Sequence, residues 1–155
     1  MKLYLVQHAE AVPKEVDPDR PLSADGRRDA ERVAGFLATA SVNAVRIVHS
    51  GKTRAQQTAE ILAQALPKNV SVEPLTGLNP NDPPQEFLKQ IEDLGDGALI
   101  VGHLPFLAKL VSRLVTGDEE HLLVRYQPGS VVCLEQDEGG VWAIAWMLRP
   151  ELFRH

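Results

Sequence analysis

Short runs of apolar residues alternate along this chain with longer segments in which apolar residues recur every three or four positions. The runs cover residues 3–6, 44–48 and 98–101 and are almost continuously apolar. Such runs are typical of parallel strands that are buried on both faces of a sheet. Because a segment with helical spacing follows each run, the pattern predicts βαβ units and a mainly parallel sheet.

Three helices are predicted after these strands. The first covers residues 25–38, with Ser23 as its N-cap, and the second covers about residues 52–66, with Ser50 as a candidate N-cap. The third follows the last apolar run, with Pro105 in its first turn. Their apolar residues fall on one face of each helix, which indicates that each covers the sheet.

The C-terminal part of the chain has a different pattern. Residues 130–135 and 141–148 resemble two strands joined by a glycine-containing turn, which predicts a hairpin that adds an antiparallel edge. A short helix is expected at residues 86–91, after a proline-rich loop. The full prediction is an α/β protein, a three-layer α/β/α sandwich, formed by a single domain over residues 1–155.

Composition and charge narrow the classes of function. The 155 residues are 44% hydrophobic and 24% charged, with a formal net charge of −5, so nonspecific binding to nucleic acid or to an anionic membrane is not expected. Cys133 is the single cysteine, so an intramolecular disulfide framework is excluded. Its thiol is expected to be buried and unreactive. With no apolar run near the roughly 18 residues of a membrane span, we expect a cytoplasmic protein.

Three of the five histidines stand at equivalent places. His8, His49 and His103 each follow an apolar run within two residues, whereas His121 and His155 lie in charged or terminal sequence and are expected in solvent. In open α/β sheets, ligands bind at the carboxyl ends of the strands. One such histidine would be an ordinary polar residue at a strand exit, but three together favour a functional site.

Arg54 adds a cation at the same predicted edge, in the first turn of the second helix. A cation there opposes the helix dipole unless an anion is also bound, so Arg54 and the helix N-terminus predict an anion site. The alternative is a surface arginine that pairs with Glu60 or is solvated. The nearby Gly51-Lys52-Thr53 imitates a nucleotide-binding P-loop, but Arg46 stands where that motif requires glycine.

Several segments together resemble a known family. Gln7-His8-Ala9-Glu10-Ala11 is similar to the Arg-His-Gly box of the histidine phosphatase superfamily. Residues 50–58 resemble its Ser-x-x-x-Arg-Ala-x-x-Thr segment, and residues 101–105 resemble its second-histidine segment. The short length, together with Arg20-Pro21-Leu22-Ser23 and His103-Leu104-Pro105, points to the SixA-like phosphohistidine phosphatase branch.

The resemblance implies a phosphoglycerate mutase-like fold and phosphoryl transfer through a covalent phosphohistidine on His8. One ring nitrogen of His8 would attack phosphorus while the other is held as N–H by a backbone carbonyl or similar acceptor. Arg54 and His103 would be the other catalytic residues, with His103 contributing a charge-assisted hydrogen bond if it is protonated. The implied enzyme uses no metal or cofactor and dephosphorylates a phosphohistidine-containing protein of phosphorelay signal transduction.

The sequence departs from the family pattern at two positions. Gln7 replaces the usual arginine, and the loss of a charged donor to a transition-state oxyanion costs roughly 100- to 1000-fold in rate. Ala9 replaces glycine, which raises the question of whether the turn needs a glycine conformation. Gln7, Arg20 and Ser50 are the candidate phosphate-binding residues. Arg20 either compensates for the missing charge or is an exposed loop arginine, and Ser50 either caps a helix or orients a group near the phosphate.

A general acid is not assigned by the sequence. Glu10 and Asp82 are the candidates, and each is otherwise a solvated loop residue at the rim of the site.

Other functions stay open at this point. Gln7 is compatible with a weakly active or inactive module that binds phosphate or phosphohistidine, and the substrate of an active enzyme could be a small phosphoester. The alternative chemistry is a metallohydrolase in which His8, His49 and His103 bind zinc or iron. The oligomeric state is not predicted.

Overall fold

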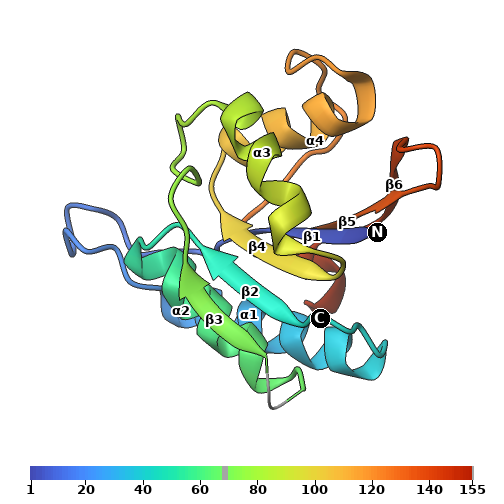
Figure 1. Cartoon of the computed structure of the whole chain (residues 1–155). Coiled ribbons are helices and arrows are strands. Elements are labelled where there is room, and N and C mark those ends of the chain that lie inside the picture. The colour runs from blue at the N-terminus through green and yellow to red at the C-terminus, as the bar shows by residue number, and fades with distance from the viewer. Residues whose placement is uncertain (68–69, 155) are drawn as a thin grey trace.

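Six strands form one mixed sheet in a computed structural model that describes residues 1–67 and 70–154 (Figure 1). The strand order is β3-β2-β4-β1-β5-β6. The first four strands in this order are parallel to one another, whereas β5 is antiparallel to β1 and to β6, so that β5 and β6 form an antiparallel edge of the sheet. The strands are β1 (Lys2–Gln7), β2 (Arg46–His49), β3 (Ser71–Pro74), β4 (Ala98–Gly102), β5 (Val131–Gln136) and β6 (Trp142–Leu148).

Helices cover both faces of the sheet, as Figure 1 shows. On one face lie α1 (Ala24–Thr39) and α2 (Thr53–Gln64), and on the other lie α3 (Pro84–Leu94) and α4 (Phe106–Thr116). A 3₁₀ helix, η1 (Pro150–Phe153), follows β6. The predicted three-layer α/β/α sandwich with a mostly parallel sheet and an antiparallel edge is therefore confirmed.

The alternation of side chains along β1 divides the core into two halves. Tyr4 and Val6 pack with the α1 and α2 layer, whereas Leu3 and Leu5 pack with α3 and α4. All four are buried, because a strand covered on both faces has no solvated side. This confirms the interpretation of the continuous apolar run.

Two elements differ from the prediction. The strand β3 was not predicted, because it is short, polar at Glu73 and only half-buried at the edge of the sheet, so it lacks the apolar pattern of the central strands. The helix α3 is longer than residues 86–91. Its buried residues Phe87, Ile91 and Leu94 recur at helical spacing, and Pro84 occupies its first turn, where a proline costs no hydrogen bond.

The helix starts give one confirmed prediction and two corrections. The Ser23 hydroxyl accepts from the Gly26 amide at 3.0 Å and caps α1 as predicted. Ser50 does not cap α2, because Lys52 occupies the cap position without a side-chain cap bond. Pro105 stands at the cap position of α4 rather than within its first turn.

The strand register places the carboxyl ends of three strands at one edge. Gln7 of β1 pairs with Gly102 of β4, and Val101 of β4 pairs with His49 of β2. Because these strands are parallel, the residues that follow them leave the sheet at the same edge. This is the edge at which the sequence places the candidate residues.

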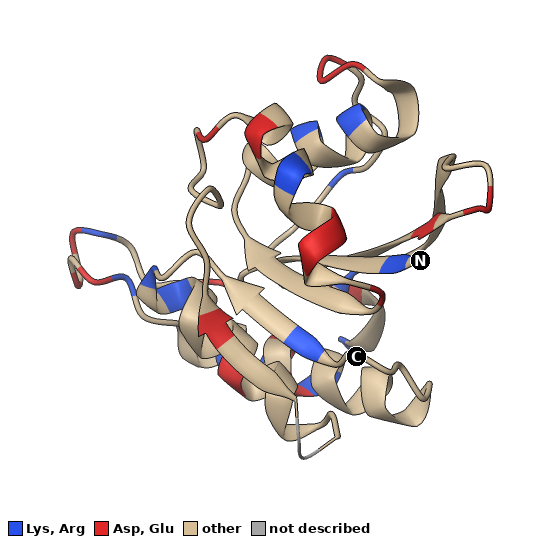
Figure 2. Ribbon diagram, viewed as in Figure 1, with Lys and Arg blue, Asp and Glu red and all other residues tan. Residues whose placement is uncertain are grey.

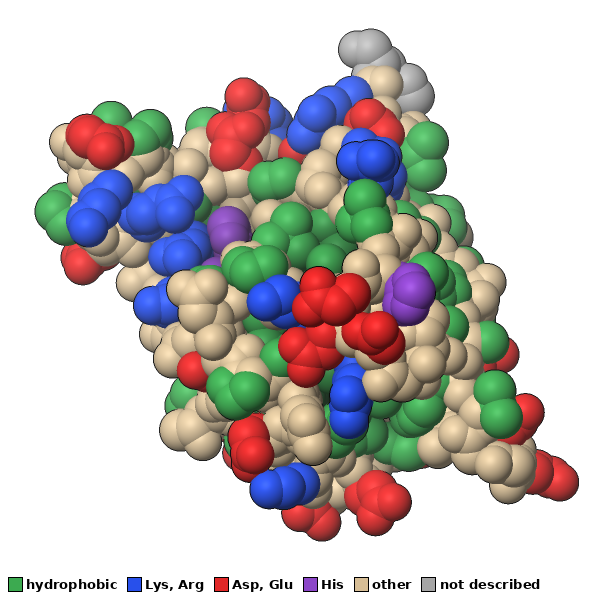
Figure 3. Space-filling view, turned by 90° about the horizontal axis from the view of Figure 1, so that it is seen from above, with side chains coloured by type: hydrophobic (Ala, Val, Ile, Leu, Met, Phe, Trp, Pro, Cys, Tyr) green, Lys and Arg blue, Asp and Glu red, His purple; other side chains and the backbone are tan. Residues whose placement is uncertain are grey.

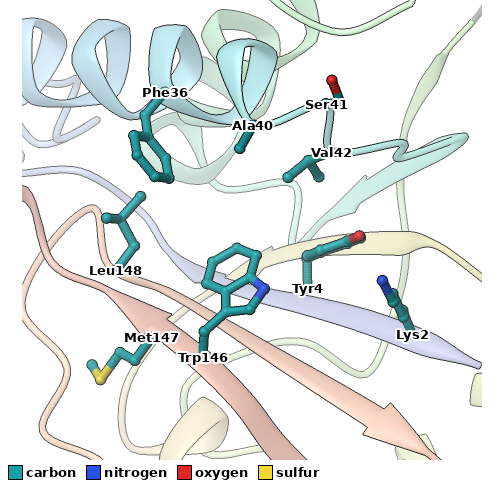
Figure 4. A pocket seen from close by; sticks show the side chains of 9 residues that line it. All are labelled: Lys2, Tyr4, Phe36, Ala40, Ser41, Val42, Trp146, Met147 and Leu148. Atoms are coloured by element: carbon teal, nitrogen blue, oxygen red, sulfur yellow. The ribbon is translucent and has the colours of Figure 1, made fainter.

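An open cavity of about 360 Å³ lies away from this edge (Figure 4). Lys2 and Tyr4 at the start of β1 form part of its wall, so it is separated from His8 by the length of that strand. Its lining residues are Lys2, Tyr4, Phe36, Ala40, Ser41, Val42, Trp146, Met147 and Leu148.

Two sequence expectations concern groups away from the site. Cys133 is fully buried in β5, and burial raises the pKa of its thiol to about 11, which agrees with the expected buried thiol. Within residues 1–67 and 70–154, no helix has the length and apolar character needed to cross a membrane.

Candidate active site

The tautomer of His8 is fixed by its own backbone. The Nδ1 of His8 lies 2.7 Å from the carbonyl oxygen of Ala9. A carbonyl oxygen only accepts hydrogen bonds, so Nδ1 carries the proton and donates it. The lone pair is therefore on Nε2, which is the arrangement expected of a nucleophilic histidine.

Burial and neighbouring cations keep the site histidines neutral. Burial is the main cause that lowers the pKa of His8; the hydrogen bond to Ala9 opposes it, the charges of Arg54 and Arg20 add to it, and together they bring this pKa to about 4. Burial also lowers the pKa of His103 to about 3, with contributions from His8, Arg54, Lys52 and Arg20. Both rings are neutral near pH 7 in the unliganded protein, so His103 carries a positive charge only if a bound anion raises its pKa.

We predict that neither ring titrates in the range of an ordinary histidine. Following the ring resonances of His8 and His103 by NMR from pH 8 downward should show neutral rings at pH 5, because both pKa values lie at about 4 or below. Protonation begins only as the pH falls toward these values. A transition near the ordinary value of about 6.5 would contradict this account of burial.

His103 lies beside His8 and contacts Ser50. The ring centroids of the two histidines are 5.1 Å apart, and the Ser50 hydroxyl shares a hydrogen bond with Nε2 of His103 at 2.6 Å. The amide of Lys52 donates to the same hydroxyl at 3.3 Å. Ser50 therefore orients the second histidine, the other role that the sequence left open for it.

Unpaired polar atoms are concentrated at this site. Of the four buried side-chain nitrogen or oxygen atoms that lack a hydrogen-bond partner among the described residues, three belong to candidate site residues: Gln7 Oε1, Arg54 Nε and His103 Nδ1. Buried polar groups without partners are costly and are rare in folded proteins. A bound ligand that offers oxygen atoms would give the Arg54 guanidinium an acceptor.

Arg20 and Gln7 also belong to this region. Gln7 is buried at the end of β1. Arg20 is half-buried, and its Nε donates to the carbonyl of Val12 at 3.1 Å. The Arg20 charge lowers the pKa of His8, His103 and Arg54, which places it within electrostatic reach of all three rather than on a remote loop.

The charged side chains that lower the pKa values of His8 and His103 are positive, although the chain as a whole carries a net negative charge. The contributing groups are Arg20, Lys52 and Arg54. Figure 2 shows Lys and Arg positions gathered at the start of α2 and on the neighbouring loop. In Figure 3, a histidine side chain lies at the surface next to a group of Lys and Arg side chains. A local excess of cations favours an anionic ligand.

The two candidate general acids, Glu10 and Asp82, are hydrogen-bonded to residues close to them in the loops. The Glu10 carboxylate accepts from the Ser23 hydroxyl at 2.8 Å, and the Asp82 carboxylate accepts from the Asn79 amide at 2.9 Å. These bonds hold the starts of α1 and of the 79–82 turn. Neither partner is one of the candidate site residues.

The remaining histidines differ from His8 and His103. His49 is buried, and its Nδ1 accepts from the Gly51 amide at 3.0 Å. His121 is exposed, with Nε2 3.8 Å from Asp118, as expected of a solvated residue, and His155 lies outside the described residues. In the described part of the chain, no group of three His, Cys, Asp or Glu side chains is arranged to hold a metal ion, so the metallohydrolase alternative has no ligand set there.

Comparison with known proteins identifies the family. A family model described as the histidine phosphatase superfamily (branch 1) matches residues 3–79, which include His8 and Arg54. The chain belongs to the histidine phosphatase superfamily. It is 25% identical over 155 residues to phosphohistidine phosphatase SixA of Escherichia coli (strain K12), which covers 97% of this chain and 94% of the relative.

Solved structures of histidine phosphatases share the fold. The protein histidine phosphatase SixA complexed with tungstate superposes with a TM-score of 0.86 at 24% identity, covering 99% of this chain and 100% of that one. The alpha-ribazole phosphatase from Shigella flexneri superposes with a TM-score of 0.78 at 18% identity, covering 97% of each chain. This likeness confirms the phosphoglycerate mutase-like fold that the resemblance implied.

The structure explains why a histidine phosphatase tolerates Ala9. Among the described non-glycine residues, only Arg20 and Ser41 have a positive φ, so Ala9 does not occupy a glycine conformation. The Ala9 carbonyl accepts the hydrogen bond from Nδ1 of His8. This contact uses only the backbone, so it does not depend on the side chain at position 9. The departure at position 9 therefore leaves the tautomer of His8 intact.

Two contacts at this candidate site were not predicted. The Thr58 hydroxyl accepts from the Ala9 amide at 3.0 Å, and the Gln57 side-chain oxygen accepts from the Leu22 amide at 2.8 Å. Both residues lie on α2 and bind the loop between β1 and α1. Thr58 is part of the family-like segment, but its partner is 49 residues away in sequence and no local pattern shows it.

Proposed function

We propose that this protein is a phosphohistidine phosphatase that transfers the phosphoryl group to His8 and then to water. The observation that carries the proposal is the ring of His8, whose Nδ1–H donates to the Ala9 carbonyl and leaves Nε2 free to attack. The family supports phosphatase activity. The SixA relative is named a phosphohistidine phosphatase, and that name supports the substrate class.

In the first step, Nε2 of His8 attacks phosphorus in line with the bond to the substrate imidazole. A P–N bond forms to His8, and the P–N bond of the substrate breaks, with its electron pair going to the leaving nitrogen. An imidazole that is protonated on its other nitrogen leaves as a neutral ring, so this step needs no strong general acid. The local contacts of Glu10 and Asp82 fit such a reaction.

In the second step, water attacks the phosphoryl group on His8. A P–O bond forms, the P–Nε2 bond breaks, and its electron pair returns to Nε2. Both protons of the water leave with the product as dihydrogen phosphate, which equilibrates with the solvent. His8 is regenerated with its proton still on Nδ1, where the Ala9 carbonyl holds it throughout.

Arg54 and His103 stabilise the charge on the transferred group. The Arg54 guanidinium, whose buried Nε lacks a partner in the described part of the chain, offers a planar pair of donors to two phosphoryl oxygens. A phosphoryl dianion beside His103 raises the pKa of that ring from its low value and allows it to donate as a cation. Positioning and electrostatic stabilisation are the main contributions in phosphoryl transfer.

The surroundings of the site favour a protein substrate over a small phosphoester. In the described part of the chain, His8, Arg54 and His103 line none of five cavities of 200 to 360 Å³. A small substrate is usually enclosed in such a cavity. A phosphohistidine that projects from another protein needs no enclosing cavity, and the proposed partner is therefore a phosphohistidine-containing domain.

The test of this function compares two substrates. A histidine-phosphorylated phosphotransfer domain and p-nitrophenyl phosphate are assayed at matched concentrations, with and without EDTA. We expect a higher kcat/KM for the protein substrate and full activity with EDTA. Activity on the small ester alone, or activity abolished by the chelator, would overturn this assignment of substrate or mechanism.

The second candidate function is a module that binds phosphate without turnover, because Gln7 stands where the family pattern has arginine. We propose that Arg20 supplies the positive charge that Gln7 lacks. Replacing Arg20 by alanine should weaken tungstate binding by about tenfold or more, as expected for the loss of a charge-assisted contact. The same change should have a smaller effect in a Gln7→Arg background. Calorimetry of the four proteins measures this coupling, and equal losses in both backgrounds would show that Arg20 does not replace the arginine.

Single-turnover kinetics separate slow turnover from none. The wild type should release phosphate, and Gln7→Arg should release it faster. Release only from Gln7→Arg would identify the natural chain as the binding module.

A further inference from the structure

Thr58 connects three parts of the candidate site. It lies one helical turn after Arg54 on α2 and is only 1% exposed. Its hydroxyl donates to the Arg54 carbonyl at 2.8 Å and accepts from the Ala9 amide at 3.0 Å. A single buried oxygen atom therefore links the backbone of the phosphate-binding arginine to the loop that follows the nucleophile.

The link continues to the His8 ring. The residue that Thr58 holds by its amide is the same residue whose carbonyl accepts the Nδ1–H of His8 at 2.7 Å. The direction of that carbonyl sets both the tautomer and the rotation of the ring. Any shift of Ala9 changes where Nε2 points.

The other side of this loop is fixed by α1. The Ser23 amide donates to the Glu10 carbonyl at 2.9 Å, and a methyl group on Gly26 would lie 2.0 Å from that same oxygen. The backbone after His8 is thus in contact with α1 at Glu10. Thr58 supplies the hydrogen bond from α2 at Ala9.

We propose that Thr58 is a positioning residue that aligns the His8 nucleophile with Arg54. The proposal rests on the proposed function, in which His8 attacks phosphorus while Arg54 binds its oxygens. The Thr58 hydroxyl is required because one atom must accept a hydrogen bond from the Ala9 amide and donate one to the Arg54 carbonyl. Valine has nearly the same shape but does neither, whereas serine does both.

The experiment uses Thr58→Val, Thr58→Ser and a matched control, Thr39→Val. Thr39 makes the same type of bond to the carbonyl four residues earlier, at 3.0 Å to Gly35, but it is exposed on α1. If Thr58→Val does not fold, Thr58→Ala takes its place. Rates are normalised to the folded fraction, which thermal unfolding measures.

Two readouts are expected to change together. Thr58→Val should slow phosphorylation of His8 by about 10- to 100-fold, the range expected when a reacting group is displaced by about 1 Å. Nitrogen-15 NMR should show His8 protonated at Nδ1 alone in the wild type and a mixture of tautomers in Thr58→Val. Thr58→Ser should stay within about threefold of the wild type, and Thr39→Val should be unchanged.

The inference fails if Thr58→Val keeps the wild-type tautomer and rate, or if Thr58→Ser is as slow as Thr58→Val. Failure of the proposed function is a separate result, in which the wild type forms no phosphohistidine on His8. The NMR measurement needs no phosphorylation, so it tests the link from Thr58 to the His8 ring in either case.

Discussion

Replacing His8 by alanine is expected to abolish turnover, with a loss on the order of 10⁴-fold or more, as is typical when a covalent nucleophile is removed. The reason is that Nε2 of His8 is the atom that accepts the phosphoryl group. His49→Ala is the matched control, since His49 is also a buried histidine that ends a parallel strand but contacts Gly51 instead. Its turnover should stay within about threefold of the wild type.

Single-turnover assays of purified, folded variants measure this effect. Because alanine removes a buried ring that contacts the Ala9 carbonyl, circular dichroism and thermal unfolding are needed to show that each variant is folded. Robust phosphatase activity of folded His8→Ala would rule out the covalent mechanism. A similar loss in His49→Ala would show that the assay reports on folding rather than on chemistry.

Replacing Arg54 by alanine is expected to reduce turnover by about 100- to 1000-fold, the usual effect of removing one donor to a transition-state oxyanion. The Arg54 Nε is buried and has no partner among residues 1–67 and 70–154, so we expect the bound ligand to supply its acceptor. Arg54→Lys should restore only part of the rate, because an ammonium group keeps the charge but not the planar pair of donors.

The same variants should lose affinity for tungstate, which calorimetry measures without catalysis. Arg113→Ala on α4 is the control, since this arginine lies in the last turn of a helix on the opposite face of the sheet, and its tungstate affinity should not change. If Arg54→Ala bound tungstate as tightly as the wild type, Arg54 would not be a phosphate-binding residue.

The fold was largely predictable because its central strands are buried on both faces. Such strands leave continuous apolar runs in the sequence, and the helices that cover them leave apolar residues at helical spacing. The edge strand β3 leaves no such run, since Ser71 and Glu73 do not need to be buried. Of the two roles that the sequence leaves open for Ser50, the helix cap is not found, because its hydroxyl is bonded to the ring of His103, which follows another strand.

The site was predictable in its location but not in its contacts. Parallel strands bring His8, His49 and His103 to one edge, and the sequence shows that much. The sequence does not show that the ring of His49 bonds to Gly51 while the rings of His8 and His103 lie 5.1 Å apart. The low pKa of His103 also depends on burial and on cations from other elements, which a local pattern does not contain.

Charge placement explains how an acidic chain provides a site for an anion. The net charge of −5 disfavours polyanionic partners, yet Arg20, Lys52 and Arg54 all act on the site histidines. A compact group of cations of this kind is suited to a single phosphoryl group. Gln7 leaves this group one charge poorer than the family pattern.

The most direct test of the central claim is to locate phosphate on the protein itself. The protein is incubated with a phosphorylated phosphotransfer domain, quenched in alkali and analysed by mass spectrometry under alkaline conditions. We predict an alkali-stable, acid-labile phosphate on His8, which is absent from His8→Ala and decays as inorganic phosphate appears. Phosphate release by the wild type without phosphorylation of His8, or the same label on His8→Ala, would contradict the proposed mechanism.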